Sequence, residues 1–376
     1  MICNKNKCTG CFACYNICPK KAIEMYEDEF GYIYPHINHE KCVNCGLCKK
    51  VCPVLNNVNS NEPVDTYAMI AKDSYKRKES SSGGAATIFA EKIIELGGVV
   101  YGCTYSKGCY IKHIRIDKIE ELKKIKGSKY VHSYVLDTFK NVRNDLNNNK
   151  KVLYIGTPCQ IAGLKNYIGN YNKSDNLYLI DLICHGVPSQ KYLKECLSNS
   201  KEDDISFRTE NGFVFREYDN NKIINETDSR DFLYYRAFFE ALIFRNNCYT
   251  CQYAKKERCS DITLGDFWGL KSDSKFYKER KKGVSLILIN SKKGEDLLRA
   301  AKGSMLLEKR EYQEASNGNN QLNNPKKKNK KYNKFQKLYI KYGFIKSYKK
   351  INRFALLKNK LRKNKLLSKI YNYIKK

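Results

Sequence analysis

Eight of the 17 cysteines in this chain form two short runs near the N-terminus that share one spacing. In each run two residues separate the first three cysteines from one another, and three residues separate the third from the fourth. A proline, Pro19 or Pro53, follows the last cysteine of each run. Thiolates with this spacing hold 4Fe–4S clusters, which carry single electrons. The two runs therefore predict one-electron chemistry at two clusters.

The fourth cysteine of each run is expected to bind the cluster of the other run, as in two-cluster bacterial ferredoxins. The predicted ligand sets are Cys8, Cys11, Cys14 and Cys52 for one cluster, and Cys18, Cys42, Cys45 and Cys48 for the other. Disulfide bonds and structural zinc are the alternatives. A doubled run of eight thiols fits neither a secreted disulfide scaffold nor a zinc site with four ligands.

Further cysteines lie near turns of the chain. Cys159 stands at a predicted strand-to-helix turn, where a helix N-terminus favours a thiolate. Cys184 follows the end of another predicted strand, and Cys248 and Cys251 form a Cys-x-x-Cys pair. These thiols predict a third metal site for which Cys259 competes, and inert buried cysteines are the alternative. The spacing leaves that choice open.

A stretch rich in Ser and Gly, residues 80–87, precedes a helix predicted over residues 88–96. Free N–H groups and the positive end of a helix dipole converge at such a loop, which favours a phosphate. An ordinary helix cap with a tight turn is the alternative. Because the G-x-G-x-x-G fingerprint is absent, a nicotinamide-type Rossmann site is excluded.

These candidate groups need elements to position them. Residues 21–39 alternate apolar and polar side chains between the cysteine runs, which predicts a β-hairpin. Strands and helices alternate from residue 66, which predicts an α/β domain. The fold class is thus an α+β two-cluster module followed by an α/β domain and a basic helical tail. The predicted boundaries are 1–56 for the module, 57–65 for a linker, 66–316 for the α/β domain, 317–331 for a low-complexity disordered linker and 332–376 for the tail.

Charge and hydropathy constrain the setting of the chain. Its 376 residues carry a net charge of +31, and residues 325–376 contain about 20 lysines and arginines and no acid. A mean hydropathy of −0.62 argues against a membrane span. No hydrophobic signal-peptide region precedes Cys8, and 17 cysteines indicate a reducing cytoplasm.

The tail carries apolar residues at helical steps with lysines between them. Phe344, Tyr348, Ile351, Phe354 and Leu357 form this stripe. A basic amphipathic helix suits an anionic membrane surface, bound peripherally, or an acidic partner. A helix that docks on its own domain is the alternative. Nucleic acid is not expected as a partner, because no recognised nucleic-acid module accompanies the charge.

Six blocks of residues occur in order beyond the cysteine runs. They are Ser82-Gly83-Gly84, Gly127-Ser128-Lys129-Tyr130-Val131, Gly156-Thr157-Pro158-Cys159-Gln160, Cys184-His185-Gly186-Val187-Pro188-Ser189, Cys248-Tyr249-Thr250-Cys251 and Asp261-Ile262-Thr263-Leu264-Gly265-Asp266-Phe267-Trp268-Gly269. With the two runs, they resemble the beta-subunit family of the hydrogenases and dehydrogenases that use a deazaflavin, coenzyme F420. The match is to the branch with an N-terminal two-cluster ferredoxin domain, and the basic tail lies outside it.

The resemblance implies that the α/β domain binds FAD. Ser82, Gly83, Gly84 and Thr87 would cradle its phosphate or ribityl groups, and Ser128, Lys129 and Tyr130 would lie along the flavin. Lys129 would then be the catalytic residue, because a cation near the ring stabilises the anionic reduced form. The resemblance also favours Cys159, Cys184, Cys248 and Cys251 as ligands of a third 4Fe–4S cluster, with Cys259 in reserve. Cys3, Cys103, Cys109 and Cys196 are interpreted as structural.

The expected function is that of an iron–sulfur flavoprotein oxidoreductase. Electrons would pass from a reduced ferredoxin or another redox protein through the clusters to FAD, and on to an organic acceptor. Related members are often encoded among polysaccharide-biosynthesis genes, which implies that metabolic setting. The alternative is a non-catalytic electron-transfer subunit of a hydrogenase- or dehydrogenase-like complex.

Overall fold

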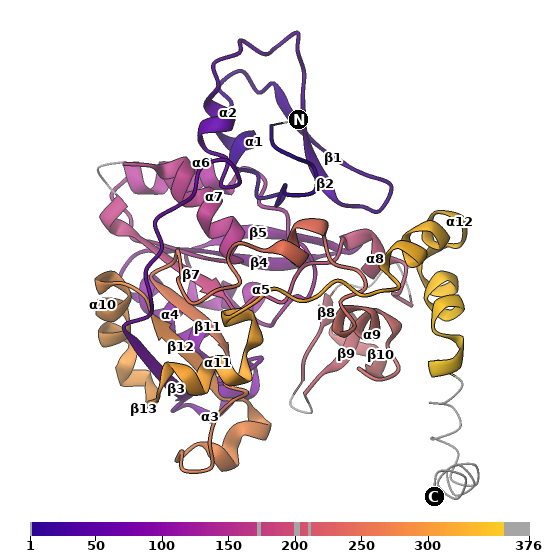
Figure 1. Cartoon of the computed structure of the whole chain (residues 1–376). Coiled ribbons are helices and arrows are strands. Elements are labelled where there is room, and N and C mark those ends of the chain that lie inside the picture. Colours follow the sequence, from indigo (N-terminus) through magenta and orange to yellow (C-terminus); the bar gives the residue numbers. More distant parts are fainter. Residues whose placement is uncertain (1, 171–173, 199–203, 210–211, 357–376) are drawn as a thin grey trace, which may run out of the picture.

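The computed structural model describes residues 2–170, 174–198, 204–209 and 212–356. An N-terminal module projects from one side of a larger α/β body (Figure 1). The module consists of α1 (Ala13–Ile17), β1 (Ile23–Glu27), β2 (Ile33–Ile37) and α2 (Leu47–Lys50). β1 and β2 pair antiparallel, so the predicted hairpin is confirmed. Its turn is closed by Asp28, whose carboxylate accepts hydrogen bonds from the backbone N–H groups of Phe30 and Tyr32.

The body contains an eight-stranded mixed sheet in the order β13-β3-β12-β11-β7-β6-β4-β5. The strands are β3 (Asp65–Ala71), β4 (Val99–Ser106), β5 (Tyr110–Ile116), β6 (Val152–Gly156), β7 (Leu177–Leu182), β11 (Ile262–Asp266), β12 (Ser285–Ile289) and β13 (Met305–Lys309). β4, β6, β7 and β11 run parallel to one another. β3 runs in the same direction as β11, because both are antiparallel to β12. The predicted α/β pattern is confirmed, with antiparallel strands added at both sides of the parallel core.

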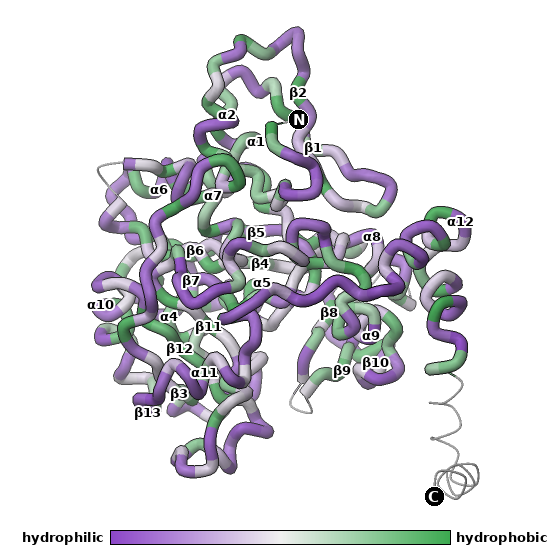
Figure 2. The backbone as a smooth tube through the Cα atoms, viewed as in Figure 1, coloured by the Kyte–Doolittle hydropathy of each residue, from purple (hydrophilic) through white to green (hydrophobic). Residues whose placement is uncertain are grey.

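Helices cover both faces of this sheet. The helices of the body are α3 (Ser74–Lys78), α4 (Ala85–Glu95), α5 (Leu122–Ile125), α6 (Thr138–Asn147), α7 (Pro158–Ile168), α10 (Lys292–Ala301) and α11 (Tyr312–Gly318). α4 and α10 pack on one face with Val100, Ile180 and Leu264. α6 and α7 pack on the other with Val99 and Leu179. Successive strand residues thus enter opposite cores, and Figure 2 shows hydrophobic stretches around β11 and β12.

A second, aromatic-rich core lies beside the sheet. It joins the small antiparallel sheet of β8 (Asp204–Ser206), β9 (Val214–Asp219) and β10 (Lys222–Asp228) to α8 (Gln190–Lys194), α9 (Leu233–Phe239) and α12 (Tyr332–Ile351). Tyr234 and Tyr235 of α9 are buried in this core. This core also receives Cys8 and Tyr32 of the N-terminal module, which fixes the module against the body.

The prediction of a disordered segment over residues 317–331 was wrong. Leu322 is fully buried, and the side chains of Asn319 and Gln321 are also buried. The Asn319 side-chain amide donates hydrogen bonds to the backbone carbonyls of Asp266 and Ala315. A polar, low-complexity composition did not prevent order here, because buried amides found backbone partners.

The described part of the basic tail docks on its own domain. Phe335, Tyr339, Phe344 and Tyr348 of α12 are buried in the aromatic core. A kink at Gly343, with a φ of 68°, turns the second half of the helix. Phe344 and Tyr348 of the predicted apolar stripe are therefore covered by protein, whereas Phe354 is 86% exposed. Leu357 and the residues after it lie outside the described residues.

No helix within the described ranges combines the length and the apolar character needed to cross a bilayer.

Candidate functional site

The structure brings the predicted ligands of the first cluster together. Cys8, Cys11, Cys14 and Cys52, here called the inner thiol set, line one small cavity under the hairpin. Burial raises the pKa values of Cys11 and Cys14, and the neighbouring Cys8 and Cys52 raise them further. The crossed arrangement, three thiols of one run with the fourth of the other, is thus present in the geometry.

Cys3 joins this group, although no spacing pattern in the sequence pointed to it. Its thiol hydrogen-bonds with Cys8 and with Cys52, which lowers the pKa of Cys8 to about 6 and that of Cys52 to about 7. Cys3 lies close to the inner thiol set only because the N-terminal residues fold back over it.

Cys18, Cys42, Cys45 and Cys48, here called the outer thiol set, occupy the projecting end of the module. Cys45 is exposed, and Cys18, Cys42 and Cys48 are partly exposed. Burial raises the pKa of Cys48, with smaller contributions from Cys42 and Cys45. Cys18 packs in the same small apolar cluster as Cys48.

The four cysteines proposed for a third site also converge, and they are here called the third thiol set. Burial raises the pKa of Cys159, and Cys184, Cys251 and Cys248 raise it further. Burial raises the pKa of Cys184 to about 12, again with a contribution from Cys251. Three chain segments distant in sequence meet here because β6 and β7 end at the same edge of the sheet.

Local structure fixes Cys159 in this position. Thr157 and Gln160 form a capping box at the start of α7, with Pro158 in the first turn. These residues begin the helix directly after β6, so Cys159 stays at the strand end. The hydroxyl of Thr157 lies 3.3 Å from the sulfur of Cys159.

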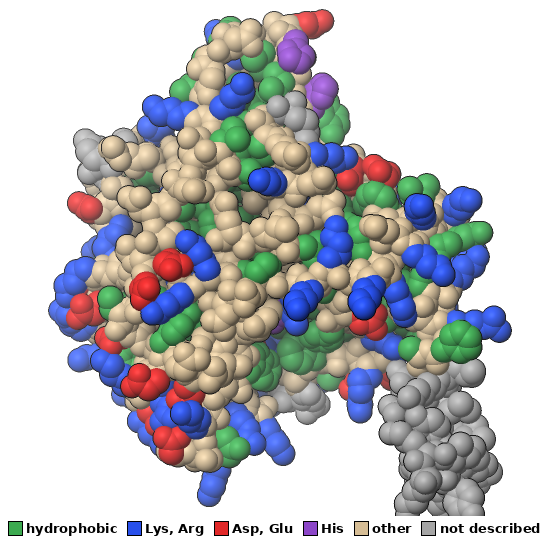
Figure 3. Space-filling view, in the orientation of Figure 1, with side chains coloured by type: hydrophobic (Ala, Val, Ile, Leu, Met, Phe, Trp, Pro, Cys, Tyr) green, Lys and Arg blue, Asp and Glu red, His purple; other side chains and the backbone are tan. Residues whose placement is uncertain are grey.

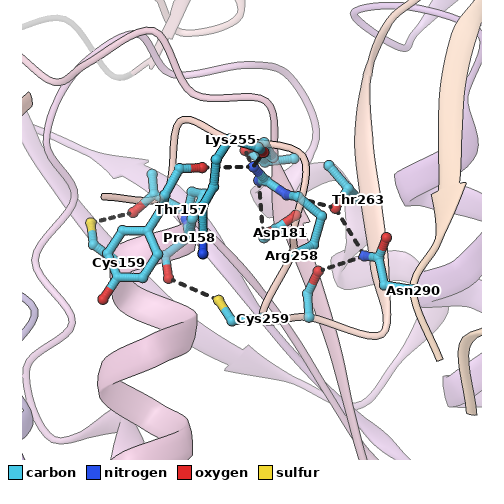
Figure 4. A network of polar contacts seen from close by, with 12 residues as sticks. Thr157, Pro158, Cys159, Asp181, Lys255, Arg258, Cys259, Thr263 and Asn290 are labelled. Carbon is cyan, nitrogen blue, oxygen red and sulfur yellow. Dashed lines mark hydrogen bonds and ion pairs between the residues drawn. The ribbon is translucent and has the colours of Figure 1, made fainter. Parts of the chain in front are cut away.

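A buried ion pair supports the loop that carries Cys251 (Figure 4). Arg258 contacts Asp181 of β7 at 2.9 Å and donates to the Tyr253 carbonyl at 2.8 Å. Cys259 lies beside this pair, where its thiol hydrogen-bonds to the Pro158 carbonyl. Burial and Asp181 raise the pKa of Cys259 to about 12. Cys259 thus already has a hydrogen-bond partner of its own beside the ion pair.

Within the described part of the chain, no group of three or more Cys, His, Asp or Glu side chains is arranged so that it could hold a metal ion. Zinc requires four ligands that converge at about 2.0–2.3 Å, whereas a 4Fe–4S cube binds each thiolate at a different corner.

A cavity of about 290 Å³ opens at the carboxyl edge of the sheet. It is formed by the loops after β3, β6, β7 and β11, which all end there. Its lining includes Ser82, Gly84, Thr87, Ser128, Lys129 and Tyr130, which are six of the seven predicted flavin contacts. Cys184 of the third thiol set lies in the same lining. The volume is near the lower end of the range for ligand sites, about 300–1,000 Å³.

Gly83 is the predicted contact that does not line the cavity. A Cβ atom at this position would lie 2.1 Å from the Met69 carbonyl oxygen and 2.7 Å from the Ser285 nitrogen. Gly83 therefore allows the loop to pack closely on the strands, rather than a ligand to approach.

The start of α4 presents donors to the cavity. Gly84 precedes the helix in a left-handed conformation, with a φ of 99°, and no described side chain caps the first turn. The buried hydroxyl of Ser82 has no partner among the described residues. The Ser81 hydroxyl accepts a hydrogen bond from the Ser128 backbone N–H at 2.8 Å, which joins the two loops. Unpaired donors at a helix N-terminus suit a phosphate.

Lys129 is enclosed by the cavity wall. Its ammonium donates a hydrogen bond to the Lys126 carbonyl at 2.5 Å, and burial lowers its pKa. Cys103, which was interpreted as structural, also lines the cavity beside Lys129. Burial raises the pKa of Cys103, and the Lys129 charge opposes that shift.

A polar chain that was not recognised in the sequence lies along the same wall. The His113 ring donates to the Ile155 carbonyl at 3.0 Å, so its other nitrogen accepts from the Ser133 hydroxyl at 3.1 Å. The Gln160 amide donates to the same hydroxyl at 3.2 Å. Burial lowers the pKa of His113 to about 4, so the ring is neutral near pH 7. No sequence motif linked these residues, because β5, β6 and α7 meet only in the fold.

The cavity has a partly exposed aromatic side. Arg208 makes an ion pair with Asp266 at 2.6 Å and lies over the rings of Phe213 and Trp268. The Nε atom of Arg208 is buried and has no partner among the described residues. Trp268, the single tryptophan of the chain, is 51% exposed. Asp266 and Trp268 belong to a block found in the sequence, but Arg208, which follows β8, was missed.

Comparison with known families gives three matches. The model for the C-terminal part of the coenzyme F420 hydrogenase/dehydrogenase beta subunit matches residues 149–315. Two models of a 4Fe-4S dicluster domain match residues 7–56 and 38–112.

Comparison with solved structures finds a chain of the F420-reducing nickel–iron hydrogenase complex from Methanosarcina barkeri. The two chains are 17% identical, with a TM-score of 0.46, and the match covers 78% of this chain and 92% of the other. Comparison with curated protein sequences finds no match.

Proposed function

Because residues 149–315 match the coenzyme F420 hydrogenase/dehydrogenase beta-subunit model and residues 7–56 match a 4Fe-4S dicluster domain, we propose that the chain is an iron–sulfur flavoprotein oxidoreductase of that family. The observation that carries this proposal is the position of Cys184. It belongs to the third thiol set and also lines the cavity that collects Ser82, Gly84, Thr87 and Lys129.

The three thiol sets suggest an order for electron flow. The outer set is the exposed one, so electrons enter there from a redox protein. The inner set is buried against α7, where a Cβ atom on Gly163 would lie 2.9 Å from the Cys11 sulfur. The same helix begins at the third set. The electrostatic environment of Tyr253 includes both Cys11 and Cys159, so the inner and third sets are neighbours.

The cavity residues fit FAD. The open N-terminus of α4 and the free Ser82 hydroxyl would hold a phosphate, and Lys129 would face the flavin. Bound there, FAD would accept single electrons and release two to an organic acceptor. Lys129 supplies positive charge. The hydrogen bonds of the Ser133 hydroxyl with His113 and Gln160 fix the direction of its proton in the cavity wall.

The acceptor would approach past Trp268 and Arg208. Among the described residues, three cationic side chains line the cavity, Lys126, Lys129 and Arg208, and one acidic side chain, Asp266. This balance favours an acceptor that is negatively charged or becomes so on reduction. The aromatic rings of Phe213 and Trp268 would contact a flat, unsaturated part of it.

Anaerobic purification with iron, sulfide and flavin analysis tests the proposal. Three cubes predict about 12 iron atoms per chain, whereas the dicluster domain alone predicts about 8. Cys184→Ala should lose about 4 of these iron atoms and retain the dicluster domain. Cys259→Ala, the matched control, should retain them all. A preparation that binds no flavin would contradict the proposed oxidoreductase function.

The single tryptophan provides an independent test of the flavin site. Addition of FAD to flavin-depleted protein should quench Trp268 fluorescence, since the indole lies at the cavity. Ser82→Ala combined with Thr87→Val should weaken this quenching. Undiminished quenching in this double variant would contradict phosphate binding at the start of α4.

A second candidate is an electron-transfer subunit without its own substrate. The matched family model describes a beta subunit, that is, one chain of a complex. On α12, the side chains of Ile340, Tyr342 and Ile345 are exposed beside lysines. Figure 3 shows lysine and arginine side chains over this part of the surface. Stable co-purification with a catalytic partner, and no turnover of acceptors by the isolated chain, would favour this candidate.

A further inference from the structure

Arg245 is a buried cation without a carboxylate partner in the described part of the chain. It is 1% exposed and lies just before η3 (Asn246–Thr250), the short helix that carries Cys248. Its Nε atom donates to the Cys8 carbonyl at 2.7 Å, and Nη2 donates to the Ile33 carbonyl at 2.8 Å. Its guanidinium carbon lies 4.1 Å from the centre of the Tyr34 ring. These neutral groups orient the charge but do not cancel it.

The third nitrogen of this side chain is unused. Nη1 of Arg245 is buried and has no hydrogen-bond partner among the described residues. Arg258, the other arginine beside the thiol sets, forms an ion pair with Asp181 in which both side chains are buried. An uncompensated buried charge is costly, so Arg245 requires a negative partner that the protein groups around it do not provide.

The contacts of Arg245 with two cysteines supply the direction of that partner. Its side chain donates to the Cys8 carbonyl at 2.7 Å, and its own carbonyl accepts from the Cys248 backbone N–H at 3.0 Å. Cys8 belongs to the inner thiol set, and Cys248 belongs to the third. The guanidinium therefore lies between two sites at which clusters would carry negative charge.

A glycine in the first cysteine loop leaves space for the guanidinium of Arg245. Gly10 has a φ of 65°, and a Cβ atom there would lie 3.3 Å from Nη1 and from the guanidinium carbon of Arg245. It would also lie 2.8 Å from the His132 ring. A side chain at residue 10 would displace the guanidinium from the first cysteine loop.

We propose that Arg245 is a counter-charge shared by the inner and third clusters, and that it raises the reduction potentials of both. A reduced cluster carries one more negative charge than an oxidised one, and a cation in a dry, low-dielectric interior stabilises that extra charge. Because one side chain lies beside both centres, its charge shifts both potentials in the same direction. The part that concerns the third cluster rests on the proposed function, whereas the part that concerns the inner cluster does not.

The test measures the midpoint potential of each cluster by redox titration monitored by electron paramagnetic resonance. Arg245→Met keeps much of the side-chain volume and removes the charge. It should shift the inner and third clusters to more negative potentials and leave the outer cluster unchanged. The outer cluster is an internal control, because it lies in the same molecule at the exposed end of the module.

Lys5→Met is the matched control variant. Lys5 also places its ammonium over the Tyr34 ring, at 4.9 Å, but its side chain is 52% exposed. Water screens that charge, so this variant should leave all potentials unchanged. Arg245→Lys should keep the potentials closer to those of the unmodified protein than Arg245→Met does.

Each remaining outcome decides the proposal. Unchanged inner and third potentials in Arg245→Met with full iron content would overturn it, and so would an equal shift of all clusters. If Arg245→Met fails to assemble its clusters, Arg245→Lys decides: full iron content supports a role for charge, and failure of both variants contradicts it. If the unmodified protein contains only about 8 iron atoms, the third site fails and the inner cluster alone carries the test.

Discussion

The two cysteine runs have the same spacing but opposite surroundings. Each run places two residues in the left-handed conformation, Gly10 and Phe12 in the first and Asn44 and Gly46 in the second. The same loop is thus formed twice, and each time a short helix, α1 or α2, follows it.

The side chains at these equivalent positions differ because only the first run meets the body. Phe12 is 2% exposed and packs with the rings of Tyr15 and Tyr134. A Cβ atom on Gly46 would have no neighbour within 4 Å. Next to the second run, Val43 is 57% exposed. Equal spacing therefore gives equal loops, whereas burial leaves one run enclosed by the body and the other exposed at the end of the module.

Loss of one cysteine from each run should produce the largest functional difference between the two runs. Cys11→Ala should lose about 4 iron atoms and stop electron transfer to the flavin from any donor. Cys45→Ala should lose as many iron atoms but retain flavin reduction by dithionite, which does not need the exposed inlet. Anaerobic absorbance changes at the flavin band measure the difference. Equal behaviour of the two variants with dithionite would contradict an ordered relay.

The two left-handed positions should differ in stability. Phe12→Ala should destabilise the protein by about 3–5 kcal/mol, because it removes a buried aromatic ring. Gly46→Ala should cost about 1–2 kcal/mol, which is only the backbone strain of a left-handed alanine. Chemical denaturation of the iron-loaded protein measures both. Similar losses would mean that the first run does not anchor the module.

Acid should weaken the inner side of the module through His132. Burial, with a contribution from Arg245, lowers the pKa of His132 from 6.5 to about 3. The unfolded chain binds this proton below about pH 6.5, so stability is complete above that value and falls as the pH decreases, by about 1.4 kcal/mol per pH unit.

His132→Gln should therefore show a flatter loss of stability between pH 6.5 and pH 4 than the unmodified protein. Denaturation at each pH measures this dependence. His36→Gln is the matched control, because His36 is exposed on the hairpin. The same flattening in both variants would remove His132 as the cause.

Charge at the outer run should have the smallest effect. Lys49 and Lys50 are exposed at the end of α2, next to Cys48. Lys49→Glu combined with Lys50→Glu should slow reduction by an acidic ferredoxin about tenfold at low ionic strength. Stopped-flow measurements should show the difference disappear at high salt. Lys292→Glu, on α10 of the body, is the control, and an equal effect there would contradict docking at the outer run.

The sequence was sufficient wherever a local pattern carried the information. The spacing of the cysteines predicted which thiols of the two runs lie together, and the alternation of residues predicted the hairpin. Strand and helix periodicity predicted the α/β domain and placed Cys159 and Cys184 at strand ends. Hydrogen bonds and loops within a few residues set these features, so their signals are contiguous in the chain.

Local patterns failed where the decisive partner is distant in sequence. The polar segment with Asn319 and Leu322 suggested disorder, yet it packs against β11 and α11. The apolar stripe with Phe344 and Tyr348 suggested either a membrane surface or docking on its own domain, and the aromatic core covers these two residues. Composition reports what a segment is able to bury, but not which surface buries it.

The cysteine runs show the same distinction between what local sequence sets and what distant residues set. Their spacing by itself determined two cluster-binding loops with crossed thiols. Only the tertiary structure decided that the first loop faces inward, with Phe12 against α6 and α7 and with Arg245 beside Cys8. The physical reason is that coordination geometry depends on neighbours in sequence, whereas burial and the electric field at a cluster depend on residues more than 200 positions away.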